Sequence, residues 1–144
     1  GSYCTLNTEF YSAFLHHHPL MSCLCYHAGF ALIERLQTGH GAESFRTMLT
    51  ESDIPNPVRV DFVAHAASMG ALSKRVGTIS ELTDALISSN GSKEVHVIVI
   101  ETAPQIWTEG TAFWEVGVPE ISDKSSVNAA RLQLLAGKAR QRGF

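Results

Sequence analysis

One short stretch carries residue types that could form the rim of a site at the end of a strand. His27 and Gly29 follow an apolar run, Leu20–Tyr26, so they would lie where a strand ends. An imidazole nitrogen or a backbone carbonyl oxygen can bind a metal ion. The alternative is that this stretch is an ordinary turn, since a loop histidine is more often exposed or hydrogen-bonded than a ligand.

Other residues with reactive side chains have simpler interpretations beside the chemical ones. The tract at 16–18 is three histidines, which could bind a metal ion or could interact with the last carbonyls of a helix and with solvent. Cys23 and Cys25 share one face of a strand, and we expect them to be buried small apolar residues rather than a redox pair. Trp107, Phe113 and Trp114 could line a substrate pocket or pack in a core or subunit interface.

The composition excludes several classes of protein. The chain has 144 residues, 44% of them hydrophobic and 17% charged, which is typical of one globular domain. Its net charge is -3, so we expect no nucleic-acid partner. No apolar run is long enough to span a membrane, and no secretory signal is visible. Three cysteines form no disulfide framework, which favours a reducing, cytoplasmic location.

The elements that would position these residues alternate between helix and strand. Helical patterns occur at 7–15, 61–70, 78–86 and 126–142, and strand patterns at Leu20–Tyr26, Leu72–Val76 and Val95–Glu101. We expect Asp61 to cap one helix, and the Thr78 to Glu81 spacing predicts a capping box for the next. The chain after Tyr26 reads as a loop, and 39–57 as a long loop with little regular structure.

These patterns together predict an α/β fold with a parallel sheet and helices on both faces. Leu20–Tyr26 is a nearly unbroken apolar run, which is typical of a buried strand, and Val95–Glu101 should be central. In such sheets ligands bind outside the carboxyl ends of the strands. The stretch from His27 onward is therefore a candidate site.

An ordered set of short sequence fragments resembles a known family. They are Gly1-Ser2-Tyr3 with 6–9, then 26–30, 35–37, 44–46, 60–62, 113–114, 116–118 and 120–122. They resemble the diphosphate-binding domain of thiamin-diphosphate-dependent enzymes, and within these the trihydroxycyclohexanedione hydrolases of inositol catabolism. The resemblance covers nearly the whole chain in order, with a shorter loop after Gly41.

The resemblance implies a fold, a cofactor and partners. Residues 1–144 would be a truncated thiamin-diphosphate-binding domain that lacks its first strand, belonging to a larger enzyme with N-terminal domains and forming a homo-oligomer. The cofactors implied are thiamin diphosphate and Mg²⁺, with no catalytic side chain in this chain. The cofactor-binding positions implied are Gly1, Ser2, Tyr3, His27, Gly29 and Phe30. Of these, His27 and the Gly29 carbonyl would contact the metal ion.

Two functional hypotheses follow. In the first, the chain is part of a hydrolase that cleaves a carbon–carbon bond in a cyclic dione. In the second, it is a non-catalytic remnant that keeps the fold and perhaps an interface. The imidazole of His27 suits zinc or copper better than magnesium, and the aspartate of the motif would precede Gly1, so we expect the chain alone to bind no cofactor. A third hypothesis, a histidine-based metal hydrolase, has only the tract at 16–18 and His27 behind it.

Overall fold

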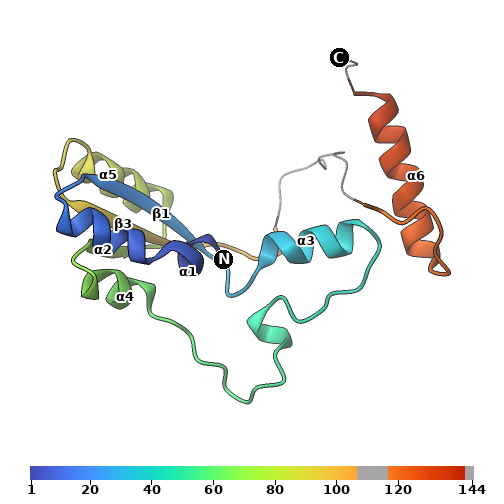
Figure 1. The fold of residues 1–144 in the computed structure, drawn as a ribbon, viewed down its shortest axis with the longest axis horizontal. Coiled ribbons are helices and arrows are strands. Elements are labelled where there is room, and N and C mark those ends of the chain that lie inside the picture. The colour runs from blue at the N-terminus through green and yellow to red at the C-terminus, as the bar shows by residue number, and fades with distance from the viewer. Residues whose placement is uncertain (107–116, 142–144) are drawn as a thin grey trace. The chain divides into compact units, whose positions relative to one another are not determined.

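The computed structural model describes residues 1–106 and 117–141, and these form two compact units (Figure 1). The first unit contains Gly1–Gly29 and Ile54–Pro104, and the second contains Phe30–Asp53 and Gln105–Phe144. The aromatic residues Trp107, Phe113 and Trp114 lie outside the described residues. Each unit is described by itself below.

The first unit is built on a three-stranded parallel sheet. Its strands are β1 (Leu20–Tyr26), β2 (Leu72–Val76) and β3 (Val95–Glu101), in the order β1-β3-β2. Leu20 of β1 and Val95 of β3 are register partners, as are Leu72 of β2 and His96 of β3. The parallel arrangement and the central place of β3 confirm the prediction from its β-branched, apolar sequence. Its Val97, Ile98 and Val99 are the largest fully buried side chains.

Helices cover both faces of this sheet, as the sequence predicted (Figure 1). On one face lie α1 (Ser2–Leu6), α2 (Thr8–Leu15) and α4 (Phe62–Ser68), and Phe10 and Ala66 pack there against Val95, Val97 and Val99. On the other face α5 (Ile79–Ser89) packs Ala85 and Leu82 against β2 and β3. The helix expected at 7–15 is therefore present, and an additional short helix, α1, precedes it.

The capping residues of α4 and α5 agree with the sequence prediction. The Asp61 side chain accepts hydrogen bonds from Val63 N and Ala64 N, which begins α4. Thr78 and Glu81 form the predicted capping box at the start of α5. Each cap provides a hydrogen-bond partner for backbone N–H groups that have none inside the helix. Because the capping residue lies within a few residues of these groups, the local sequence predicts where α4 and α5 begin.

The second unit corrects the expectation of loop structure after Tyr26. It contains the helix α3 (Ala31–Gly39), a 3₁₀ turn η1 (Leu49–Glu51) and the helix α6 (Ser125–Ala139), which was predicted at 126–142. Val118, Val127 and Leu134 form a small buried cluster in this unit, and Ala31 and Met48 are also buried. Gly41 has φ = +81° and approaches the backbone of Ser126 so closely that a Cβ would clash there, and the Ser126 hydroxyl donates to its carbonyl (2.6 Å). Ala31–Gly39 was missed because only Ala31 and Glu34 of this helix are buried, so no apolar stripe marks it.

The expectation that β1 is buried, with Cys23 and Cys25 inside, is wrong. β1 is an edge strand, and both cysteines are exposed. An apolar run does not distinguish a central strand from an edge strand, because the place of a strand depends on which strands pair with it and not on its own composition. Within the described residues, no helix has the length and apolar character needed to cross a membrane.

Candidate functional site

The carboxyl edge of the sheet is formed by the ends of the three parallel strands. The last residues of β1 and β3, Tyr26 and Glu101, are register partners, and Thr102 N donates to Tyr26 O (2.9 Å). Glu101 forms an ion pair with Arg75 of β2, and both side chains are largely solvent-exposed. This edge therefore carries one paired acidic and basic group beside the point where the chain leaves β1.

His27 is the first residue after β1. Its Nδ1 atom is buried and has no hydrogen-bond partner among the described residues. Leaving a buried polar atom unpaired is costly, so such an atom marks a place where a ligand, an ion or water could bind. Ala28 follows in the left-handed region, with φ = +54°, which turns the chain sharply before Gly29.

Phe30 opens the second unit. Its N–H donates to Thr47 O (2.8 Å), and its carbonyl accepts from Glu34 N (3.0 Å), so it stands at the start of α3. Its side chain is 54% exposed. The structure therefore gives Phe30 a clear local role as the residue before a helix, and it lies in a different unit from His27 and Gly29.

Gly1 and Ser2 stand at the beginning of α1. The Gly1 carbonyl accepts from Thr5 N (3.2 Å) and from the Thr5 hydroxyl (3.1 Å). No side chain caps this end of α1, and the first N–H groups of a helix have no partner within it. The sequence prediction of a Gly-Ser turn at a helix start therefore corresponds to a real helix start, one turn earlier than the helix expected at 7–15.

Tyr3 is a core residue by its side chain. Its ring lies 5.2 Å from that of Phe10 and 5.2 Å from that of Phe62, between ring centroids. Its hydroxyl is 3.0 Å from Nδ1 of His65. Burial, and secondarily the nearby charge of the Cys4 thiolate, raises the pKa of Tyr3 above its ordinary value. The side chain of Tyr3 is thus engaged in ring packing and in the contact with His65.

Phe62 connects the two candidate stretches. Its ring contacts the ring of Tyr3 and also that of Tyr26, with 5.4 Å between the second pair of centroids. Tyr26 directly precedes His27, so the start of α1 and the end of β1 pack on one aromatic cluster. The structure thereby brings the Gly1–Tyr3 and His27–Gly29 stretches to the same side of the first unit, although they are far apart in sequence.

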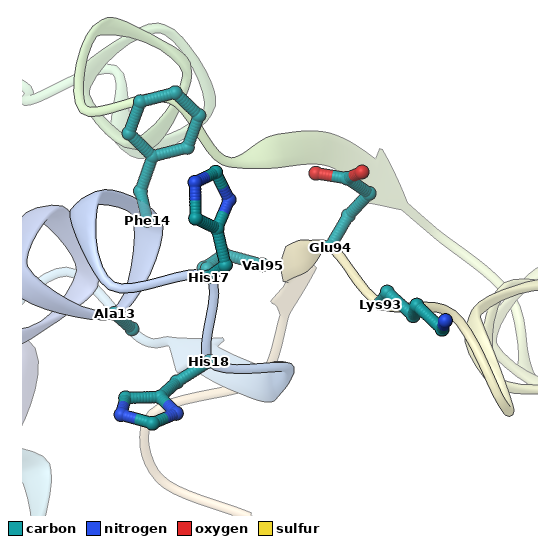
Figure 2. Close-up of a pocket in the computed structure, with 7 residues that line it drawn as sticks. All are labelled: Ala13, Phe14, His17, His18, Lys93, Glu94 and Val95. Atoms are coloured by element: carbon teal, nitrogen blue, oxygen red, sulfur yellow. The ribbon is translucent and has the colours of Figure 1, made fainter.

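A pocket of about 140 Å³ lies at the opposite end of the sheet (Figure 2). It is lined by residues from the end of α2, the histidine tract and the start of β3: Ala13, Phe14, His17, His18, Lys93, Glu94 and Val95. Figure 2 shows the ring of His17 beside Phe14 and the ring of His18 on the other side of the chain. Within the part of the chain that the structure describes, no three His, Cys, Asp or Glu side chains are grouped to hold a metal ion.

Sequence reasoning missed two polar groups. The first is the Arg75–Glu101 pair, whose only signal was an acidic residue ending the strongest strand. The second is Glu34 in α3, which is 7% exposed and accepts from the Thr47 hydroxyl (2.5 Å) and the Ser44 hydroxyl (2.8 Å). Ser44 also contacts the carboxylate of Glu51. These bonds tie α3 to the segment that follows it, so Glu34 has a structural role in the second unit.

The fold and these positions define a class: a parallel α/β unit whose candidate ligand groups lie at the carboxyl edge of its sheet. Known proteins similar to this chain have the name 3D-(3,5/4)-trihydroxycyclohexane-1,2-dione hydrolase. Those of Bacillus cereus and Bacillus anthracis are 31% identical over 137 residues, which cover 90% of this chain. The one from Bacillus thuringiensis is 30% identical over the same length. The relatives thus have the name predicted from the sequence fragments, which confirms that resemblance.

The similarity covers one part of these relatives. This chain spans about a fifth of the length of the relatives it matches, 21%. No profile of a known protein family matches the chain. No solved structure is significantly similar to it.

Proposed function

We propose that this chain is the diphosphate-binding part of a thiamin-diphosphate-dependent hydrolase that cleaves a carbon–carbon bond in the cyclic dione of inositol catabolism. The observation that carries the proposal is the similarity to hydrolases of that name over 90% of the chain. The packing of Tyr3 and Tyr26 on Phe62 supports it, because this packing brings Gly1–Tyr3 and His27–Gly29 to the same end of the first unit. A diphosphate and its cation would need groups from both stretches. The cofactor would supply the carbanion chemistry, and the protein would bind and orient the cofactor.

Each of the six proposed cofactor-binding residues has a defined part in this proposal. Gly1, Ser2 and Tyr3 would offer backbone N–H groups to the diphosphate at the start of α1. His27 and the Gly29 carbonyl would face the cation, and the unpaired Nδ1 of His27 is consistent with a ligand contact. Phe30 would follow them along the chain as an apolar neighbour.

The described residues do not fit a complete magnesium site. Mg²⁺ prefers oxygen ligands in near-octahedral geometry, whereas His27 offers nitrogen. The carboxylate at the same edge of the sheet, Glu101, is engaged with Arg75. No described group of three acidic, histidine or cysteine side chains is arranged around an ion. The chain therefore needs further parts of a longer protein for cofactor binding, and the implied N-terminal domains are its proposed partners.

The alternative is a non-catalytic domain that keeps the fold and an interface. The incomplete magnesium site is the observation that favours it. In either case we propose self-association and a location in the cytoplasm, where a reducing environment would keep Cys4, Cys23 and Cys25 as the free thiols that the structure contains.

Calorimetric titration with thiamin diphosphate and Mg²⁺ tests the proposal. We expect no measurable binding by the chain alone, because the cation lacks hard ligands. A form extended at its N-terminus by a strand ending in Gly-Asp and carrying His27→Asn should gain binding. The matched control is the same extended form ending in Gly-Ala, which should not. Binding by the unmodified chain at micromolar concentration would contradict the ligand argument, and no gain in the extended form would support the non-catalytic alternative.

A further inference from the structure

Phe30 is held by hydrogen bonds on both sides of its backbone. Its N–H donates to Thr47 O (2.8 Å), and its carbonyl accepts from Glu34 N (3.0 Å). The Thr47 hydroxyl in turn donates to Oε2 of the Glu34 side chain (2.5 Å). The three bonds therefore form a closed ring through Phe30, Thr47 and Glu34, and all three residues belong to the second unit.

The interior of this hydrogen-bond ring is shielded from water. The Glu34 side chain is buried, and so are Ala31 and Met48, which follow Phe30 and Thr47 in the chain. Hydrogen bonds in such surroundings are electrostatically stronger than bonds exposed to solvent. Further segments of a longer protein can only cover these side chains more, so the ring does not depend on where the given sequence begins.

A buried carboxyl group is a costly way to hold two segments together. An apolar side chain at this position would be buried without the desolvation cost of a polar group. A carboxyl oxygen, however, can accept from two hydroxyl groups at once, and Oε2 of Glu34 accepts from those of Ser44 (2.8 Å) and Thr47. The choice of a carboxyl group therefore indicates that the position of the Ser44–Thr47 backbone matters.

The bond from Phe30 N fixes the whole peptide group between Gly29 and Phe30. No cis peptide bond is present among the described residues, so this peptide is trans and planar. In a trans peptide the C=O of one residue points opposite to the N–H of the next. While Thr47 O holds the N–H of Phe30, the Gly29 carbonyl cannot rotate, and it points away from Thr47.

We propose that Glu34 is a positioning residue, which acts through Thr47 to fix the direction of the Gly29 carbonyl. What this carbonyl binds rests on the proposed function. Of the two groups assigned to the cation, the Gly29 carbonyl is the one that suits Mg²⁺, because it offers oxygen. A carbonyl that is held in advance binds without first losing its freedom to rotate, which raises affinity.

Amide exchange in the chain itself tests the hydrogen-bond ring. Thr47→Val removes the hydroxyl but keeps the side-chain shape and the backbone carbonyl, so the Phe30 amide should exchange about fivefold faster, the usual effect of losing one hydrogen bond. Thr47→Ser keeps the hydroxyl and should restore the parent rate. The matched control is Thr38→Val, which removes a hydroxyl that donates to Glu34 O (3.0 Å) on the same helix but outside the ring.

The rates are measured by NMR, with the amides of β3 as an internal reference. An unchanged Phe30 rate in Thr47→Val, or an equal acceleration in Thr38→Val, would overturn the proposal.

Binding measurements separate positioning from stability. In the extended form that ends in Gly-Asp and carries His27→Asn, Thr47→Val and Glu34→Leu should each weaken binding of thiamin diphosphate with Mg²⁺ about fivefold. Glu34→Gln keeps an acceptor oxygen and should retain most of the affinity. Lower melting temperatures with unchanged affinity would mean that Glu34 is only structural, which would overturn the proposal. If the extended form itself binds nothing, the proposed function fails, and the exchange rate of the Phe30 amide still decides whether Glu34 fixes this peptide.

Discussion

Among single residues, Glu81 is the one whose charge the fold stabilises most directly. Its Oε2 atom accepts hydrogen bonds from Gly77 N (2.7 Å) and Thr78 N (3.2 Å) at the start of α5. The hydrogen bond from Gly77, followed by that from Thr78, holds the pKa of Glu81 below its ordinary value. The folded chain thus favours the ionised carboxylate.

This shift gives a pH-dependent contribution to stability with a definite sign. A carboxyl group whose pKa is lowered by folding stabilises the fold above its unfolded pKa of about 4.3, and that contribution is lost as the pH falls through the folded value. Glu81→Gln should therefore lower the melting temperature at neutral pH, and the difference from the parent chain should vanish in acid. Asp84→Asn, on the same helix, is the matched control for the loss of one negative charge. Calorimetric melting across the acid range checks it, and a constant difference would contradict it.

At the same scale, the sequence predicted the place of His27 and Gly29 in the fold better than it predicted which side chains lie near them. His27 and Gly29 follow the end of a strand, as their place after an apolar run predicts. The Arg75–Glu101 pair could not be predicted, because it depends on which strands lie side by side. The core position of the Tyr3 ring likewise depends on α4, which begins dozens of residues later in the chain.

At the scale of elements, the start of α4 depends on the side chain of Asp61. Asp61 accepts from Val63 N (3.0 Å) and from Ala64 N (3.1 Å) at the start of this helix. The helix carries Phe62 and Ala66 into the core of the first unit. The cap thus stabilises both the helix and the contact that joins Tyr3 to Tyr26.

Removing this cap gives a prediction for the element. Asp61→Ala should destabilise the chain by about 1 kcal/mol, the usual cost of losing an N-cap. Asp61→Asn keeps an acceptor oxygen and should cost much less. Urea denaturation followed by circular dichroism measures both variants. Equal losses for the two would show that the charge of Asp61, rather than its hydrogen bonds, matters.

The elements that were predicted and those that were missed differ in a physical way. β3, α4 and α5 have strong local signals: a β-branched run, a cap and a capping box. α3 has none, since its Leu32 and Ile33 are exposed and its buried residues include Glu34. A helix held by a buried carboxylate and hydroxyl groups leaves no apolar periodicity to read.

At the scale of the whole molecule, the two units have cores of different kinds. The first has apolar clusters on both faces of its sheet, with β3 buried between them. The second has one small cluster of Val118, Val127 and Leu134, with Ala31 and Met48 buried elsewhere in it. Since local stability follows buried apolar contact and hydrogen bonding, the first unit should hold most of the stability of the chain.

Hydrogen exchange followed by mass spectrometry tests this distribution. The amides of β3 should exchange most slowly, because Val97 and Val99 are fully buried and β3 is paired on both sides. The amides of α6 should exchange much faster, because this helix packs on one small buried cluster and its local unfolding costs little free energy. Leu134→Ala should accelerate exchange in α6 and leave β3 unchanged if the two units open separately. Equal protection of β3 and α6, or a Leu134→Ala effect that reaches β3, would mean that the units unfold as one.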